Sequence, residues 1–156
     1  MSALEKDHIL EQARYLIYNQ DMSAIIYRLT HVNGWSSDEA IEATNQYRNY
    51  LYLAKKYKDS YTLPPSKDID DVWHAHILHT KDYIKFCNEV FGEYLHHTPG
   101  TGEVQDKNNN KFPNLFEQTQ ELYKREFGDY IYSVRDKPLI LRVQQYFVKS
   151  KKSHDI

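Results

Sequence analysis

Histidine and carboxylate side chains that could bind a metal ion are concentrated in one part of the chain. Five of the eight histidines lie between positions 74 and 97, together with the single cysteine, and three aspartates lie just before them at positions 68, 70 and 71. Imidazole and carboxylate groups are the usual protein ligands of zinc, iron, nickel and copper. This segment therefore holds most of the chain's capacity to bind such a metal, and we expect the functional site here.

The spacing of these residues limits which of them can act together. Asp70 and His74 are four positions apart and would lie on one face of a helix, one turn from each other. His74 and His76 are two apart and would point about 160° away from each other, so a regular helix cannot direct both to one ion. His96 and His97 follow the expected helix, and a return of the chain would bring one of them beside His74 or His76. A site assembled in this way would leave coordination positions open, as catalytic metals require.

Two functions of different classes fit this pattern. The first is a metal-binding protein, or a zinc- or iron-dependent enzyme whose divalent metal activates water or dioxygen. Its predicted ligands, with His76 as either a ligand or a supporting group, are Asp70, His74, His76 and His97. The residues predicted to line the pocket or support the ligands are Trp73, Tyr83, Cys87 and His96. The second function is a non-catalytic interaction module, in which the Trp/His motif is a polar core network that fixes helix packing.

Each candidate residue also has a purely structural interpretation. His76 shares a helical stripe with Tyr83 and Cys87, so it fits a hydrogen-bonded core residue as well as a ligand. Asp70 fits a first-turn partner of the helix dipole. Cys87 fits a small core side chain rather than a nucleophile. His79 fits a partly exposed helical residue outside the site. The sequence leaves these alternatives open.

The elements that must position these residues are predicted to be helices. The chain has only five glycines and five prolines, and such sparse breaks favour long helices joined by short loops. Apolar residues at three- and four-residue spacing predict helices over residues 4–18, 22–32, 37–57, 67–91, 114–127 and 137–149. Ser36 with Glu39 has the spacing of a capping box, and Ser66 is placed to cap the helix at 67–91. Residues 98–112 are expected to form a loop.

These elements predict an all-α protein of about five or six helices. The 156 residues suit a single domain, expected over residues 1–148 and followed by a flexible polar tail at 149–156. Residues 130–134 are rich in β-type side chains and could form a short β-hairpin, which would be marginal by itself.

Composition excludes several classes of protein. Lys+Arg 20 against Asp+Glu 22 gives a net charge of −2, which argues against a nucleic-acid binder. No apolar run approaches the ~20 residues that span a bilayer. The N-terminus carries charges where a signal peptide needs an apolar core. We therefore expect a cytoplasmic protein whose partner is a small molecule or another protein, with no role at a membrane or on nucleic acid.

The motif around the histidines also resembles a known family. The residues that carry the resemblance are Asp70-x-x-Trp73-His74-x-His76-Ile77-Leu78 and Phe91-Gly92-x-Tyr94-Leu95-His96-His97-x-Pro99. Over residues 34–99 the chain resembles the glycine-rich domain-containing protein-like family, although it lacks the glycine-rich stretch of the plant members. The resemblance implies no established biochemical activity. It places the family's polar motif on Asp70, Trp73, His74, His76, Tyr83, Cys87, His97 and Pro99.

Overall fold

Six helices make up the fold. The computed structural model describes residues 1–98 and 115–136. The helices are α1 (Ala3–Asn19), α2 (Ser23–His31), α3 (Ser37–Lys56), α4 (Lys67–Leu78), α5 (Thr80–Phe91) and α6 (Leu115–Phe127). The described residues contain no strand, which confirms the all-α prediction, and the hairpin considered at 130–134 does not form. The predicted helix at 137–149, the tail at 149–156 and all but the first residue of the loop at 98–112 lie outside the described residues.

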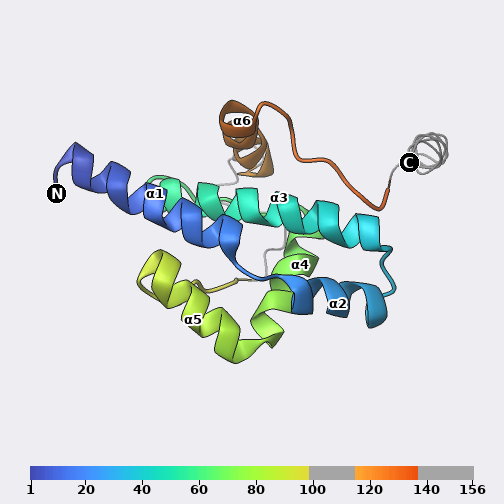
Figure 1. The fold of residues 1–156 in the computed structure, drawn as a ribbon. Coiled ribbons are helices and arrows are strands. Elements are labelled where there is room, and N and C mark those ends of the chain that lie inside the picture. The colour runs from blue at the N-terminus through green and yellow to red at the C-terminus, as the bar shows by residue number, and fades with distance from the viewer. Residues whose placement is uncertain (99–114, 137–156) are drawn as a thin grey trace, which may run out of the picture.

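Helix α3 is the centre of the packing. It contacts α1, α2, α4 and α6. Figure 1 shows α1 running beside α3, with α6 on one side of this pair and α2, α4 and α5 on the other. Fully buried side chains from α2, α3, α4 and α5 meet in the core, among them Leu29, Tyr47, Leu51, Ile69, Val72 and Phe86. None of the described helices is long and apolar enough to cross a membrane.

Capping residues start the helices where the sequence predicts. The Ser36 hydroxyl accepts a hydrogen bond from the Glu39 amide at 3.2 Å, and the Glu39 carboxylate accepts one from the Ser36 amide at 3.0 Å. This reciprocal pair satisfies two amides that the helix itself leaves without partners. The Ser66 hydroxyl accepts from the Ile69 amide at 3.2 Å at the start of α4. Helix α5 ends at Gly92, whose φ of 72° is left-handed.

The predicted continuous helix over residues 67–91 is wrong, because the chain breaks at His79. The backbone there leaves the helical region (φ −84°, ψ 66°), and the His79 ring Nδ1 lies 2.8 Å from the Ala75 carbonyl. In a straight helix Trp73 and Tyr83 would lie about 15 Å apart along the axis. Their side chains could not then form the hydrogen bond that they make in the structure. The break instead lets α5 fold back against α4 and α1, so that the apolar faces on both sides of His79 are buried.

Beyond α6 the chain returns along α3 toward the N-terminal end of that helix (Figure 1), and hydrogen bonds to Asp68 place it at the start of α4. The Gln46 side-chain amide of α3 donates a hydrogen bond to the Tyr132 carbonyl at 3.2 Å. Val134 is buried, and its amide donates to the Asp68 carboxylate at 2.8 Å. The segment that follows α6 is therefore packed on the helix that carries the histidine motif.

Candidate metal centre

Three of the predicted ligands lie together in the structure. Asp70 and His74 come from successive turns of α4, and His97 comes from the segment that follows α5. His97 Nε2 lies 2.7 Å from Asp70 Oδ1 and 2.7 Å from His74 Nε2. His74 Nε2 lies 3.5 Å from Asp70 Oδ2. One ligand atom from each residue lies within 4.8 Å of the other two. We call these three residues the Asp70 cluster.

Hydrogen bonds would satisfy this arrangement only if one proton were shared between two acceptors. Each Nε2 atom carries either a proton or a lone pair. A proton on His97 Nε2 is contested by Asp70 and His74, and protons on both rings would oppose each other at 2.7 Å. If only His74 Nε2 is protonated, the lone pair of His97 Nε2 faces the negatively charged Asp70 carboxylate at 2.7 Å, and the two repel each other. A single cation between the three atoms would accept all three lone pairs at once.

The separations also match those of ligands on one metal ion. Neighbouring ligands about 2.1 Å from an ion lie about 3 Å apart at right angles and about 3.4 Å apart in a tetrahedral site. The closest atom pairs in the Asp70 cluster are separated by 2.7, 2.7 and 3.5 Å. Small movements of the side chains would therefore bring all three groups to coordination distance.

The surroundings of His97 favour the neutral imidazole. Its side chain is 10% exposed, against 52% for His74 and 31% for Asp70. Burial lowers the pKa of His97, and the neighbouring His74 acts in the same direction, while Asp70 opposes both. Only the neutral imidazole has a lone pair for a metal, so a lowered pKa reduces the competition from protons.

Two of the residues predicted to support the ligands contact His97 or its backbone segment. The Trp73 ring lies over the His97 ring, with centroids 4.2 Å apart and 31° between the planes. The Trp73 indole Nε1 donates to the Tyr83 hydroxyl at 2.8 Å. That hydroxyl donates to the Leu95 carbonyl at 2.5 Å. Trp73 and Tyr83 therefore connect both helices to the segment that carries His97.

His76 lies apart from the Asp70 cluster, on the opposite face of α4. It is 1% exposed, and its Nδ1 is 2.8 Å from the hydroxyl of Tyr47 in the core. Its Nε2 has no hydrogen-bond partner among the described residues, and the rings of Tyr83 and Phe86 lie 5.0 Å from the imidazole. Burial lowers the pKa of His76 to about 4. This placement fits the core interpretation of His76.

Cys87 and His96 also lie outside the cluster. Cys87 is fully buried beside the Tyr83 hydroxyl, and burial raises the pKa of its thiol, which disfavours the nucleophilic thiolate. His96 is exposed, and its ring meets the edge of Tyr94 at a centroid distance of 4.7 Å. Of the adjacent pair, only His97 is directed to α4.

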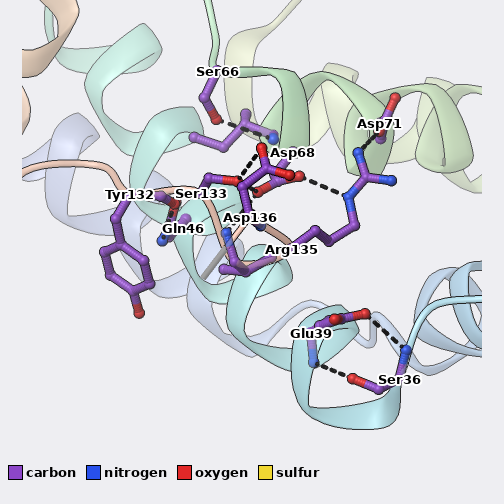
Figure 2. Close-up of polar contacts among 12 residues, drawn as sticks. Ser36, Glu39, Gln46, Ser66, Asp68, Asp71, Tyr132, Ser133, Arg135 and Asp136 are labelled. Carbon is purple, nitrogen blue, oxygen red and sulfur yellow. Dashed lines mark hydrogen bonds and ion pairs between the residues drawn. The ribbon is translucent and has the colours of Figure 1, made fainter. Parts of the chain in front are cut away.

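Arg135 was not singled out by the sequence, yet it determines which aspartate of α4 is available. Its guanidinium binds Asp68 Oδ1 at 2.9 Å and Asp71 Oδ2 at 2.7 Å, and it lies 4.3 Å from the centre of the Trp35 ring. Figure 2 shows Arg135 reaching both carboxylates from the segment beyond α6. Asp70, on another face of the same turn, is left to the two histidines. No local pattern predicts this contact, because Arg135 and Asp68 are 67 positions apart.

Comparison with known proteins corrects the family resemblance. A family described as UCP032817-like matches residues 11–118, a range that contains the whole Asp70 cluster. No curated protein and no solved structure matches the chain. The resemblance to the glycine-rich domain-containing protein-like family was wrong, because the match over most of the chain is to a different family and nothing supports the other. The short Asp-x-x-Trp-His-x-His motif was too little to identify a family. The chain belongs to the UCP032817-like family, which is uncharacterised.

Proposed function

We propose that the protein binds one divalent metal ion, zinc or iron, through Asp70, His74 and His97. The observation that carries the proposal is the convergence of two imidazole nitrogens and a carboxylate oxygen within 4.8 Å. Without an ion, one proton on His97 Nε2 would have to be shared between Asp70 and His74, whereas a cation would be bound by all three groups. Asp70 and His74 lie on α4 and His97 lies in the segment after α5, so a bound ion would also hold residues 92–98 against α4.

The donor set indicates the chemistry that such an ion would supply. Two histidines and one carboxylate leave coordination positions for water or substrate. Zinc in this setting activates water for hydrolysis, and iron(II) activates dioxygen. His74 is 52% exposed, so the cluster can be reached from solvent. The same three ligands serve either metal.

One observation favours the alternative, a non-catalytic interaction module. His76, Tyr47 and Tyr83 form buried contacts that fix α3, α4 and α5 against one another. This half of the motif acts in packing. If the Asp70 cluster likewise served only as a polar contact, the whole motif would be structural and partners would bind elsewhere on the protein.

Metal analysis distinguishes the two functions. Protein without a histidine tag is purified, its metal content is measured by elemental analysis, and Zn²⁺, Fe²⁺, Ni²⁺ and Cu²⁺ are titrated calorimetrically after chelation. We expect one ion per chain and at least about tenfold weaker binding in His74→Ala, His97→Ala and Asp70→Asn. His96→Ala is the matched control, because it removes an exposed imidazole adjacent to His97 but outside the cluster. A wild-type protein that takes up none of the four ions excludes the proposal, as does equal binding by the cluster variants and the control.

A further inference from the structure

One buried hydroxyl joins three separate parts of the protein next to the Asp70 cluster. Tyr83 lies on α5 and is fully buried. Its oxygen accepts a hydrogen bond from Trp73 Nε1 of α4 at 2.8 Å and donates one to the Leu95 carbonyl at 2.5 Å. The Cys87 thiol lies beside the same groups, but a thiol is a weak donor and acceptor. Beside the contacts of His97 with Asp70 and His74, the Tyr83 hydroxyl therefore forms a second polar link between α4 and the segment after α5.

Both partners of this hydroxyl act on His97. The Trp73 ring lies over the His97 ring, with centroids 4.2 Å apart and a tilt of 31°, and Leu95 precedes His97 by two residues. The first contact restrains the imidazole, and the second restrains its backbone. We propose that Tyr83 is a positioning residue that holds His97 beside Asp70 and His74. The consequence for metal affinity rests on the proposed function, whereas the consequence for the position of residues 93–98 does not.

The hydroxyl can be removed with little change to the packing around it. The Tyr83 ring contacts the rings of His76 at 5.0 Å and Tyr94 at 5.3 Å, and phenylalanine would keep both contacts. Tyr83→Phe therefore removes the hydrogen bonds to Trp73 and Leu95 and the weaker contact with the Cys87 thiol, while it keeps the ring. The Leu95 carbonyl would then turn toward water, and His97 would have to be ordered when the metal binds. That ordering cost lowers affinity.

Tyr47 provides a matched control. It is also fully buried, and its hydroxyl also makes a 2.8 Å hydrogen bond, in this case to His76 Nδ1 in the core. Neither Tyr47 nor His76 belongs to the Asp70 cluster. Tyr47→Phe therefore reports the general effect of losing a buried hydroxyl, and the difference between the two variants reports the effect on His97.

The experiment measures Zn²⁺ affinity by competition with a chelator and amide hydrogen exchange of residues 93–98 in the metal-free protein. We expect Tyr83→Phe to bind Zn²⁺ about 10- to 100-fold more weakly than wild type, the usual loss when a partner that supports a ligand is removed. We expect Tyr47→Phe to stay within about twofold of wild type. Amides 93–98 should exchange faster in Tyr83→Phe than in Tyr47→Phe. Trp73→Phe, which removes the indole donor and also reduces the ring that lies over His97, provides the test if Tyr83→Phe does not fold, and we expect a loss in the same direction.

The outcomes separate this inference from the proposed function. If wild type binds Zn²⁺ and the Tyr83 and Tyr47 variants bind it equally, the role of Tyr83 is refuted while the metal site stands. If wild type binds no metal, the proposed function fails, and hydrogen exchange alone decides whether Tyr83 holds this segment. Unchanged exchange in Tyr83→Phe relative to Tyr47→Phe then refutes the positioning role as well.

Discussion

Arg135 binds two aspartates of α4 in different environments, and the structure predicts unequal costs for losing them. Asp68 is 4% exposed and accepts hydrogen bonds from Arg135 Nε at 2.9 Å, the Val134 amide at 2.8 Å and the Ser133 hydroxyl at 3.3 Å. Asp71 is 29% exposed, and Arg135 is its one ion-pair partner among the described residues. Figure 2 shows the two carboxylates on either side of the guanidinium. The perturbations to compare are Asp68→Asn and Asp71→Asn.

The magnitudes follow from burial and from the number of bonds. Breaking a buried charged pair costs about 3–5 kcal/mol, and a hydrogen bond to a charged group contributes about 1.5–3 kcal/mol. Arg135 is 30% exposed and can be partly solvated, so we expect the lower end, about 3 kcal/mol, for Asp68→Asn. An asparagine at position 68 would also point its side-chain N–H₂ group at Arg135 or at the Val134 amide, which are themselves donors. The more exposed Asp71 pair should contribute less than about 1 kcal/mol.

Urea unfolding followed by far-ultraviolet circular dichroism measures both costs, provided that the dependence on denaturant is unchanged between variants. Asp68→Asn should lower the unfolding midpoint strongly, and Asp71→Asn only slightly. Equal losses in the two variants would refute the reasoning, because it attributes the difference to the greater burial of Asp68 and to its additional hydrogen bonds. A loss below about 1 kcal/mol for Asp68→Asn would also refute it, since that is the value of an exposed pair.

Three further predictions concern stability. Burial lowers the pKa of His76 from 6.5 to about 4 in the folded protein, so between these pH values only the unfolded chain binds the proton. The free energy of unfolding of the wild type, kept metal-free with a chelator, should therefore fall by about 3 kcal/mol as the pH is lowered from 6.5 to 4. The Tyr47→Phe/His76→Phe double variant removes this titration, and an undiminished pH dependence in urea unfolding would exclude His76 as its source. Gly92→Ala should cost about 1–2 kcal/mol in thermal unfolding, because alanine is strained at φ 72°, and Gly92→Asn should recover part of the loss. Ser36→Ala should cost about 1 kcal/mol through loss of the capping box, whereas Ser36→Asp should retain most of the stability; equal losses would contradict the capping role.

Local interactions explain why the helices could be predicted from the sequence. The predicted helix at 4–18 is observed as Ala3–Asn19, and the one started by Ser36 is observed as Ser37–Lys56. Capping, apolar spacing and the stop at Gly92 each involve residues within about one or two turns of one another. The same local geometry placed Asp70 and His74 on one face and directed His76 away from them, although it left open whether His76 is a ligand or a core residue.

The long-range contacts that complete the site could not be predicted from local sequence patterns. His97 meets His74 across 23 residues, and helix spacing does not separate it from the neighbouring His96, so the choice of His97 as a predicted ligand rested on the family resemblance. The break at His79 also escaped the helical pattern, because the apolar spacing continues on both sides of it. The family resemblance failed for a related reason: a short motif records local spacing, whereas membership depends on most of the chain.

The sequence by itself determined an all-α protein and a histidine-rich helix with one potential ligand pair, Asp70 and His74. These features depend on periodicity and capping, which act over a few residues. The tertiary structure decided that His97 completes the cluster, that His76 belongs to the core, and that Arg135 occupies the two flanking aspartates. Those outcomes depend on how α5 folds back and where the segment after α6 packs, and such long-range contacts are selected by burial of the whole core rather than by any local pattern.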